Sequence, residues 1–383
     1  MHSLSEVAVI GGGVIGCSVA YHLAQQGVAV TLLEQRGIAS AASGASAGGV
    51  RQQGRDPREL SFAIRSIAKW RTLEDELAAD VHFYREGHVQ VIERAADLPE
   101  VDRRVAAQRE LGLDIRVVHA ADLKELVPGI ATHVVAGTYT ADDGHANPIL
   151  TTHAFANAAR RHGAHIRVGS RVTRIHRRGG YVRGLSTTSG DVACDWLVLA
   201  AGAWSTMLAQ QFDVSLPIEL MGPQMIATTP VPPVLGQVVG ALSRRLSLKQ
   251  LRGGNFIIGG GWPGDVDMAS GIATPRLESI LGSLVDSSAI YPALRHVQVE
   301  RAWVGVEALT VDEVPILGPL PGVENVTVAT GFSGHGFALS PIIGQVMAEL
   351  IVDGAPSIPI DELTFERFAR ATGAGVKPTM RPG

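Results

Sequence analysis

The stretch EVAVIGGGVIGCSVAYHLAQQGVAVTLLE, residues 6–34, decides the fold of this chain. Its first five residues form a short run suited to a buried parallel strand, and a G-x-G-x-x-G spacing follows at once through Gly11, Gly13 and Gly16. In such a turn the first glycine permits the tight bend, the second lets a pyrophosphate approach the backbone, and the third lets the next helix pack on the sheet. The pattern predicts a helix over 14–26 whose positive end faces the phosphates.

A second strand and an acid complete this unit. Gly27 ends the helix, and the apolar run 28–33 delivers Glu34 to the carboxyl end of the second strand. A carboxylate there can accept hydrogen bonds from both hydroxyls of an adenosine ribose and would repel a 2′-phosphate. Because every part of the motif is in its place, residues 6–34 predict a dinucleotide-binding unit.

Composition and charge bound the class of protein. At 383 residues the chain exceeds one average domain, which favours two lobes or one large core with an inserted layer. With 46% hydrophobic and 18% charged residues it resembles a compact α/β enzyme. The net charge of −4 gives no electrostatic footprint for nucleic acid, and the short basic pairs at 160–161 and 177–178 read as solvated surface.

The two cysteines, Cys17 and Cys194, are expected to be small buried hydrophobes, since neither has a C-x-x-C or metal-ligand spacing. We therefore expect no metal site. No apolar run approaches the ~20 residues that a membrane span needs. The chain enters its first strand within a few residues, which leaves no room for a signal peptide, so we expect a cytoplasmic protein and leave peripheral membrane contact open.

The rest of the chain alternates between two styles. The glycine-rich stretch 37–60 is too small in its side chains to build core, so its backbone is expected to wrap a ligand. Strands that end in glycine turns recur at 196–201 and 326–331, whereas 216–310 reads as several strands with one helix. Further predicted elements are helices at 61–79, 121–126, 149–161, 276–289 and 340–352, strands at 81–94, 113–119, 166–168, 172–175, 224–229 and 255–259, a turn at 142–148 and a hairpin at 179–180.

These elements predict an α/β protein with a Rossmann-like nucleotide-binding domain and an inserted antiparallel-sheet domain that forms a cap. The nucleotide-binding domain is expected to be discontinuous, over 1–80, 142–215 and 311–383. The substrate or cap domain takes 81–141 and 216–310.

The chain resembles the flavin-dependent amine oxidoreductases of the D-amino-acid oxidase superfamily, in the branch of sarcosine oxidase, glycine oxidase and D-amino-acid dehydrogenases. The resemblance spans nearly the whole chain and rests on VIGGGVIGCSVAYHLAQQG near the N-terminus, the SGASAGGVRQ loop at 43–52, LVLAAGAWS at 197–205 and ATGFSGHGFALSPIIGQVMAELI at 329–351. It implies an FAD-binding domain of the glutathione-reductase type, with FAD bound in an extended form.

The resemblance also implies which residues surround FAD. The first glycine turn would hold the pyrophosphate, Glu34 the adenosine ribose, the 43–46 segment the phosphates or ribityl chain, and 48–51 the isoalloxazine. The 331–337 segment would close over the flavin ring, where glycine N–H groups and a helix N-terminus can stabilise negative charge. The full set is Gly11, Gly13, Val14, Ile15, Gly16, Glu34, Gln35, Arg36, Ser43, Gly44, Ala45, Ser46, Gly48, Gly49, Val50, Arg51, Val172, Ala201, Gly202, Trp204, Gly331, Ser333, Gly334, His335, Gly336 and Phe337.

Three departures from the family pattern change its expectations. Some relatives tether the flavin through a cysteine, and Gly305 takes that position ahead of the TVDE segment at 310–313, so FAD is expected to be noncovalent. The lysine that binds the substrate carboxylate in some relatives is replaced by Ala338. The arginine that does so in others is replaced by Glu307.

Arg51 and Glu307 are the charged candidates for contact with a substrate. Arg51 follows the glycine loop towards the flavin ring and can pair a carboxylate, or else belongs to the surface or the cofactor shell. Glu307 can face a cationic or polyhydroxyl substrate group, or else pair with Arg301 as a structural acid.

Histidines supply the other candidates for chemistry. The resemblance places His335 beside the flavin, where it is either a proton shuttle or a residue that bonds to backbone in a glycine turn. His88 and Tyr84 lie in the predicted strand FYREGHVQV and face either the pocket or solvent, and His145 is expected to belong to its turn.

The resemblance implies oxidation of the C–N bond of an amino acid or secondary amine by hydride transfer to FAD, a reaction in which positioning of the neutral amine dominates. Alternatives are a catalytic subunit of a hetero-oligomeric dehydrogenase, and a non-catalytic FAD-binding scaffold. Electrons would pass to a partner protein, a quinone or oxygen. No lysine occurs between Lys249 and Lys377, so the strand NFIIGGGWPGD lacks the lysine that assists oxygen in many relatives, and we expect a dehydrogenase more than an oxidase.

Overall fold

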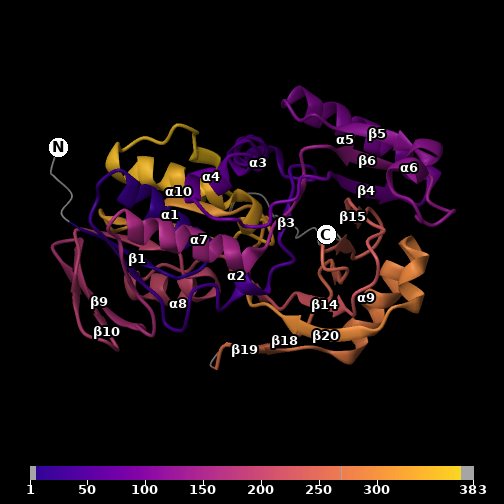
Figure 1. Ribbon diagram of the computed structural model, residues 1–383. Helices are drawn as coiled ribbons and strands as arrows, with labels where there is room; N and C mark the ends of the chain where they lie inside the picture. Colours follow the sequence, from indigo (N-terminus) through magenta and orange to yellow (C-terminus); the bar gives the residue numbers. More distant parts are fainter. Residues whose placement is uncertain (1–5, 269, 372–383) are drawn as a thin grey trace.

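The computed structural model describes residues 6–268 and 270–371, and it is built around two large sheets (Figure 1). The first sheet is the nucleotide-binding one. It has six strands in the order β22-β23-β12-β1-β2-β8, all parallel except for the β22–β23 pair. Its strands are β1 (Val7–Ile10), β2 (Val30–Leu33), β8 (His165–Arg167), β12 (Trp196–Leu199), β22 (Ile316–Pro319) and β23 (Val326–Thr330).

Helices cover one face of this sheet. The helices α1 (Val14–Gln25), α7 (Pro148–Arg161) and α10 (Gly336–Val352) pack together there (Figure 1). The approach of α1 to α10 depends on Gly344, because a Cβ atom at that position would lie 2.0 Å from Ser18 Oγ. This close packing fixes the N-termini of both helices relative to the sheet.

A small sheet covers the opposite face. Its strands β9 (Val172–Arg178), β10 (Tyr181–Thr187) and β11 (Val192–Ala193) are antiparallel and share an apolar cluster with the large sheet, which includes Val182, Leu197 and Val328. The nucleotide-binding part therefore has three layers, as expected for a sheet that is apolar on both faces.

The second large sheet has eight strands in the order β20-β14-β17-β16-β15-β4-β6-β5, and its neighbours are antiparallel except for the parallel pair β15–β4. The helices α6 (Ala120–Leu126) and α9 (Leu277–Ile290) share an apolar cluster with it. The strands are β4 (His88–Ile92), β5 (Arg116–His119), β6 (Ala136–Thr140), β14 (Gln224–Thr228), β15 (Val238–Ala241), β16 (Ser247–Gln250), β17 (Phe256–Gly259) and β20 (Val299–Val304).

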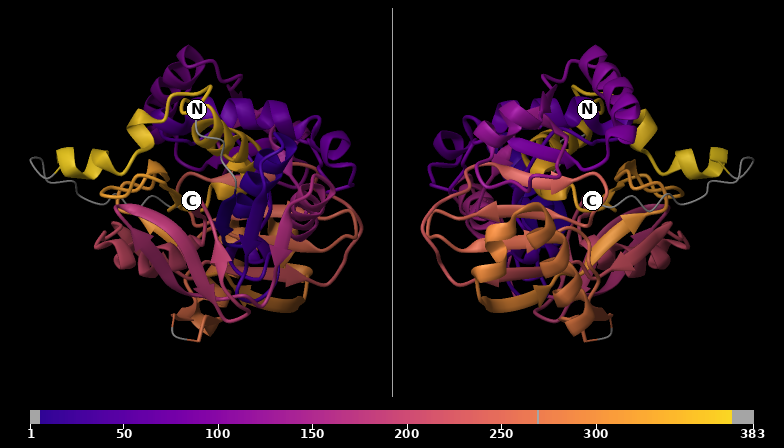
Figure 2. Two further views of the ribbon diagram at one scale, coloured as in Figure 1. Left: turned by 90° about the vertical axis from the view of Figure 1, so that its left-hand side faces the viewer. Right: turned by 90° about the vertical axis from the view of Figure 1, so that its right-hand side faces the viewer.

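Short elements connect the two sheets and border the space between them. The helix α11 (Glu366–Ala371) lies at the outer edge of the molecule (Figure 2), where Arg367 donates to both carboxylate oxygens of Asp312. The remaining helices and strands are α2 (Ala42–Ala45), α3 (Pro57–Trp70), α4 (Leu73–Leu77), α5 (Leu98–Glu110), α8 (Ser205–Ala209), α11 (Glu366–Ala371), β3 (Gly49–Val50), β7 (Gly144–His145), β13 (Ile218–Met221), β18 (Asp265–Asp267), β19 (Ile272–Thr274) and β21 (Glu307–Thr310).

The α/β fold predicted from the sequence is confirmed, with several differences in detail. The predicted helix over 61–79 is two helices, α3 and α4, and α3 begins at Pro57 because Asp56 caps it by accepting a hydrogen bond from Arg58 N. The helix α10 begins at Gly336, four residues ahead of the predicted start at 340. It contains Pro341. The helix α5 was not predicted, and the predicted turn at 142–148 contains the strand β7.

The predicted division into domains stays a prediction. The strands of the six-stranded sheet fall within 1–80, 142–215 and 311–383, and those of the eight-stranded sheet within 81–141 and 216–310. Residues 1–5 and 372–383, at the ends of the first and last ranges, lie outside the described residues.

Candidate active site

A single large cavity of about 1270 Å³ runs from the glycine turn after β1 to the eight-stranded sheet. At its first end Gly11 has φ +120°, and a Cβ atom there would lie 2.3 Å from the carbonyl oxygen of Ala200. Gly16 packs against the same turn, with a virtual Cβ 2.0 Å from the carbonyl oxygen of Gly11. Only glycines allow this close approach, so the turn matches the pyrophosphate cradle predicted from the sequence.

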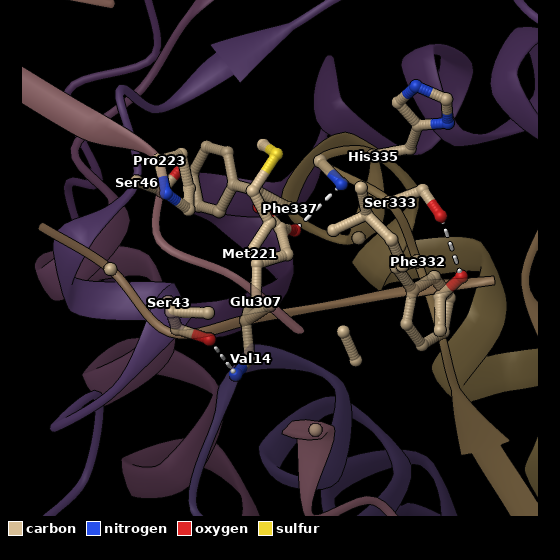
Figure 3. A pocket seen from close by; sticks show the side chains of 18 of the residues that line it. Val14, Ser43, Ser46, Met221, Pro223, Glu307, Phe332, Ser333, His335 and Phe337 are labelled. Atoms are coloured by element: carbon tan, nitrogen blue, oxygen red, sulfur yellow. Dashed lines mark hydrogen bonds between the residues drawn. The ribbon is translucent and has the colours of Figure 1, made fainter. Parts of the chain in front are cut away.

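The N-terminus of α1 forms the floor of this cradle. Ser43 Oγ accepts a hydrogen bond of 2.9 Å from Val14 N, which ties the 42–46 segment to the helix (Figure 3). Gly13 faces the same hydroxyl, with a virtual Cβ 3.2 Å from Ser43 Oγ. The remaining N–H groups of the first helical turn are available to an anion.

Glu34 lies at the carboxyl end of β2, as predicted. One of its carboxylate oxygens accepts a hydrogen bond from Gly12 N and the other from Arg36 N, both at 2.7 Å. The residue is 8% exposed and borders the cavity. Each carboxylate oxygen has a further lone pair, so the carboxyl group is fixed in place and can still accept bonds from ribose hydroxyls.

Most of the predicted cofactor residues border the cavity. The exceptions are Gly16, Gly44, Gly48 and Val50, which lie behind it. Those that border it are Gly11, Gly13, Val14, Ile15, Glu34, Gln35, Arg36, Ser43, Ala45, Ser46, Gly49, Arg51, Val172, Ala201, Gly202, Trp204, Gly331, Ser333, Gly334, His335, Gly336 and Phe337. The volume exceeds the ~300–1,000 Å³ typical of a single small-ligand pocket, so it has room for a dinucleotide and a substrate.

Charged side chains gather where the loop after β3 meets the start of α10. Arg51 and Arg55 both border the cavity, and Arg55 Nη2 donates to the carbonyl oxygen of Arg51 at 3.1 Å. Arg55 is 6% exposed, and its Nε and Nη1 atoms have no hydrogen-bond partner in the described part of the chain. Arg51 donates only a long bond of 3.4 Å to the carbonyl oxygen of Gln53. The pair therefore offers N–H donors to a ligand.

Burial disfavours the charged form of both arginines. It lowers the pKa of Arg55 to about 9, and the positive charge of Arg51 acts in the same direction, against the charges of Glu59 and Asp143. Burial also lowers the pKa of Arg51, which Asp143 and Glu59 oppose. A bound anion would supply the counter-charge that these side chains lack.

His335 contacts this group from the opposite side. Its Nδ1 lies 2.9 Å from Glu59 Oε1, and the side chains are 16% and 1% exposed. Burial would raise the pKa of Glu59, but His335 and Arg55 hold it below its usual value. Burial and the charge of Arg55 lower the pKa of His335, which Glu59 opposes. The lowered pKa of Glu59 indicates an ionised carboxylate in contact with His335, with Arg55 near enough to help balance its charge.

Glu307 begins β21 and borders the same cavity. Its Oε1 accepts a hydrogen bond of 2.7 Å from Gly334 N, and Figure 3 shows it near the loop that carries Ser333 and His335. The sequence left open a pairing of Glu307 with Arg301. Within residues 6–268 and 270–371 the two make no ion pair, and Arg301 lies over the Trp303 ring at 4.7 Å instead. That alternative is wrong.

Of the other candidates, His88 borders the cavity, whereas His145 and Tyr84 do not. His88 borders the cavity, with its Nδ1 2.6 Å from Gln53 Nε2. His145 is in β7, not in a turn, and pairs with Gly49 of β3. Tyr84 forms an isolated bridge with His145 behind the cavity and lies under Arg252.

Sequence reasoning missed Arg55, Glu59 and Lys249. The first two follow Arg51 at intervals of four residues, and the Asp-Pro start of α3 at 56–57 was the signal that they belong to a structured helix entry. Lys249 is 4% exposed in β16, on the same face of the sheet as cavity residue Ser247. Its Nζ lies against Gly48, 3.2 Å from where a Cβ atom would be. Lys249 therefore places an amine beside the 48–51 loop, although the strand NFIIGGGWPGD itself lacks a lysine.

Two further features agree with the departures noted in the sequence. Gly305 borders the cavity, and a Cβ atom there would be 3.1 Å from the Cβ of Ala45. Ala338 is buried, and its carbonyl oxygen accepts bonds from Ser66 and Trp70.

In the described ranges, no three His, Cys, Asp or Glu side chains are grouped to hold a metal ion. No helix within them is long and apolar enough to cross a membrane.

The glycine turn after β1, the acid after β2 and the charged end of the cavity are the arrangement expected of a dinucleotide-dependent oxidoreductase. The chain belongs to the family described as FAD dependent oxidoreductase, DAO, which it matches over residues 6–350. Membership confirms the resemblance inferred from the sequence motifs and establishes an FAD-dependent enzyme class.

Individual relatives are distant but cover the chain. It is 28% identical over 376 residues to 4-methylaminobutanoate oxidase (formaldehyde-forming) of Paenarthrobacter nicotinovorans, covering 95% of this chain and 46% of that protein. It is 26% identical to sarcosine oxidase subunit beta of Rhizobium meliloti (strain 1021), covering 98% of this chain and 92% of that one. The crystal structure of L-proline dehydrogenase from P. horikoshii superposes with a TM-score of 0.90, at 28% identity, over 97% of this chain and 99% of that chain. The chain thus spans about half of some curated relatives and nearly all of others.

Proposed function

We propose that this protein oxidises a C–N bond in an amine that also carries a carboxylate, such as an amino acid, an N-methyl amino acid or an imino acid. The observation that carries the proposal is the pair of arginines at the cavity: Arg55 is buried with two N–H groups that have no partner among the described residues, and the partly buried Arg51 lies beside it. Three similar proteins are named for reactions of 4-methylaminobutanoate, sarcosine and L-proline, each of which joins an amine to a carboxylate.

FAD fits the residues of the cavity. The glycine turn and α1 would hold its pyrophosphate and Glu34 its ribose, while 331–337 would close on its ring. We propose that FAD is noncovalent, because Gly305 offers no side chain for a tether. When bound, FAD supplies the hydride acceptor for the reaction.

The side chains of this protein would position the substrate. Arg51 and Arg55 bind the carboxylate by charge-assisted hydrogen bonds, and Glu59 keeps Arg55 charged. His335 is neutral near pH 7, and its contact with Glu59 fixes the N-terminus of α10. Holding the reacting carbon in one geometry is the main contribution that the protein can make to such a reaction.

A second candidate is the flavin-bearing subunit of a hetero-oligomeric dehydrogenase. It is favoured by relatives that are themselves named as subunits, sarcosine oxidase subunit beta and hydrogen cyanide synthase subunit HcnC, of which the chain covers 92% and 97%. A non-catalytic scaffold is disfavoured by the oxidoreductase family and by the charged cavity.

The test is anaerobic reduction of the holoprotein. Purified FAD-loaded protein is mixed with a panel of D-, L- and N-methyl amino acids, imino acids and simple amines, and loss of the yellow absorbance is followed. We expect bleaching by an amine that carries a carboxylate and none by its decarboxylated counterpart. Bleaching by simple amines alone, or by no member of the panel, would contradict the proposal.

A further inference from the structure

We infer that Glu307 accepts the proton that the substrate ammonium must lose before its C–N bond is oxidised. The inference rests on the proposed function and assigns a base to it. Glu307 is set at the start of β21, borders the cavity, and touches the 331–337 loop directly through the hydrogen bond from Gly334 N.

Glu307, Arg51 and Arg55 border the same cavity. Gly334 donates to Glu307, and the next residue, His335, contacts Glu59, which in turn lies near Arg55. The 331–337 loop thus connects the acid with the group of charged side chains around the arginines. A substrate in this cavity whose carboxylate meets Arg51 and Arg55 can turn its nitrogen to Glu307.

No cation neutralises Glu307 in the described part of the chain. Its only hydrogen bond there comes from Gly334 N, which engages one oxygen and leaves the other free for a ligand. The charged groups on the elements packed around it are Glu219 on β13, Glu300 and Arg301 on β20, Asp265 and Asp267 on β18, His335 before α10, and Asp312 and Glu313 after β21.

Burial raises the pKa of Glu307, and the Gly334 hydrogen bond opposes that shift. This is the direction that a base needs in order to hold a proton taken from an ammonium group.

The other titratable groups in and near the cavity are less suited to accept the proton. His88 is held by Gln53, and His335 turns its Nδ1 to Glu59. Lys249 lies behind Gly48 and does not border the cavity. Glu59 neighbours Arg55, which balances its charge.

The proton transfer is simple to balance. The amine arrives as an ammonium ion because an alkyl amine has a pKa of ~10. One N–H bond breaks, an O–H bond forms on Glu307, and the electron pair of the broken bond stays on nitrogen. That pair is then available to form the C=N bond, and FAD, when bound, would supply the acceptor for the hydride. Without the proton transfer, the nitrogen has no electron pair with which to form that bond.

The test is stopped-flow reduction of the FAD-loaded protein between pH 6 and pH 10, comparing wild type with Glu307→Gln. The amide oxygen of glutamine can still accept the bond from Gly334. At pH 7 we expect the second-order rate constant for flavin reduction to fall ~100-fold, the lower range for loss of a general base. The deficit should shrink as pH rises towards the amine pKa, since the free amine then forms in solution.

Two control variants and three binding measurements accompany this test. Glu349→Gln makes the same change on α10 outside the cavity and should leave the rate unchanged. Glu307→Asp keeps an acid and should keep the wild-type shape of the pH profile. FAD occupancy and the binding of acetate, which has no amine, should be unchanged in Glu307→Gln. Binding of 2-methylalanine, which has no α-hydrogen to lose, should weaken at pH 7.

The outcomes separate the two proposals. A Glu307→Gln deficit that is the same at every pH, or no deficit at all, overturns the role of Glu307 and leaves the proposed function standing. A wild-type flavin that no carboxylate-bearing amine reduces overturns both.

Discussion

Lys249 lies against Gly48, with its Nζ 3.2 Å from the position that a Cβ atom on residue 48 would occupy. Burial lowers the pKa of this lysine to about 7. Burial is the one cause of this shift, and no hydrogen bond or charge of a described residue contributes to it. Because the 48–51 loop is the one expected beside the flavin ring, the protein holds there a group whose charge changes near neutral pH.

This arrangement predicts a pH-dependent reaction with oxygen. The first electron transfer to oxygen creates a superoxide-like anion, which a nearby cation stabilises. Lys249 is charged below a pKa of about 7 and loses its charge as pH rises through that value. We expect the rate constant for reoxidation by oxygen to fall by roughly tenfold between pH 6 and pH 8.5. Above pH 8 an artificial dye should accept electrons much faster than air-level oxygen does, as in a dehydrogenase.

Stopped-flow mixing of the substrate-reduced protein with oxygenated buffer measures this prediction. Lys249→Met should be slow at every pH, whereas Lys124→Met, which alters an exposed lysine on α6, should behave as wild type. Reoxidation that matches substrate turnover at pH 8.5 in Lys249→Met would show that Arg51, and not Lys249, supplies the cation.

The carboxylate of Glu34 should contribute strongly to FAD binding. Its two oxygens already accept bonds from Gly12 N and Arg36 N, which orient it towards the cavity. Glu34→Ala removes charge-assisted bonds to two ribose hydroxyls and also leaves two backbone N–H groups without their acceptor. We expect the FAD dissociation constant to rise by a factor corresponding to about 2 kcal/mol or more. Fluorescence titration of apoprotein with FAD measures it, and an unchanged constant would remove Glu34 from the site.

FAD should leave the protein on denaturation. Gly305 stands where some relatives carry the tethering cysteine, and both cysteines of the chain, Cys17 and Cys194, are buried away from the cavity. Burial raises the pKa of the Cys194 thiol to about 12 and raises that of Cys17 as well, which keeps both as unreactive thiols. Acid precipitation should leave the yellow colour in the supernatant. A flavin-linked peptide in a mass-spectrometric digest is the result that would contradict this.

The sequence predicted the nucleotide end of the site better than the substrate end. The cradle depends on local rules, namely glycine spacing, strand length and one acid, so Gly11, Gly13 and Glu34 could be placed from 29 consecutive residues. Lys249 could not, because its position beside Gly48 depends on the pairing of β16 with β15 and β17 in a sheet assembled from distant segments. Glu59 was missed for a different reason: the helix start at Pro57 was placed too late, so this residue was assigned to loop. Arg55 lies in the loop just ahead of the Asp56 cap, and its place at the cavity depends on how that loop folds.

Arg51 and Arg55 should bind the substrate carboxylate and not the cofactor. Arg55→Met removes the fork whose Nε and Nη1 lack partners, and Arg51→Ala removes its neighbour. Each is expected to weaken the binding of a simple monocarboxylate such as acetate by at least about tenfold, since a charge-assisted hydrogen bond contributes roughly 1.5–3 kcal/mol. Perturbation of the flavin spectrum on titration with acetate measures this, and FAD occupancy should remain that of wild type.

The pH dependence of acetate binding distinguishes the two arginines. Arg55 has a pKa of about 9, so it is charged below that pH and loses its charge as pH rises through it. Acetate is ionised throughout this range, and its affinity for wild type should therefore fall as pH rises through 9, with no such fall in Arg55→Met. If Arg51→Ala releases FAD while acetate still binds to the protein that retains it, Arg51 belongs to the cofactor shell and Arg55 alone anchors the carboxylate.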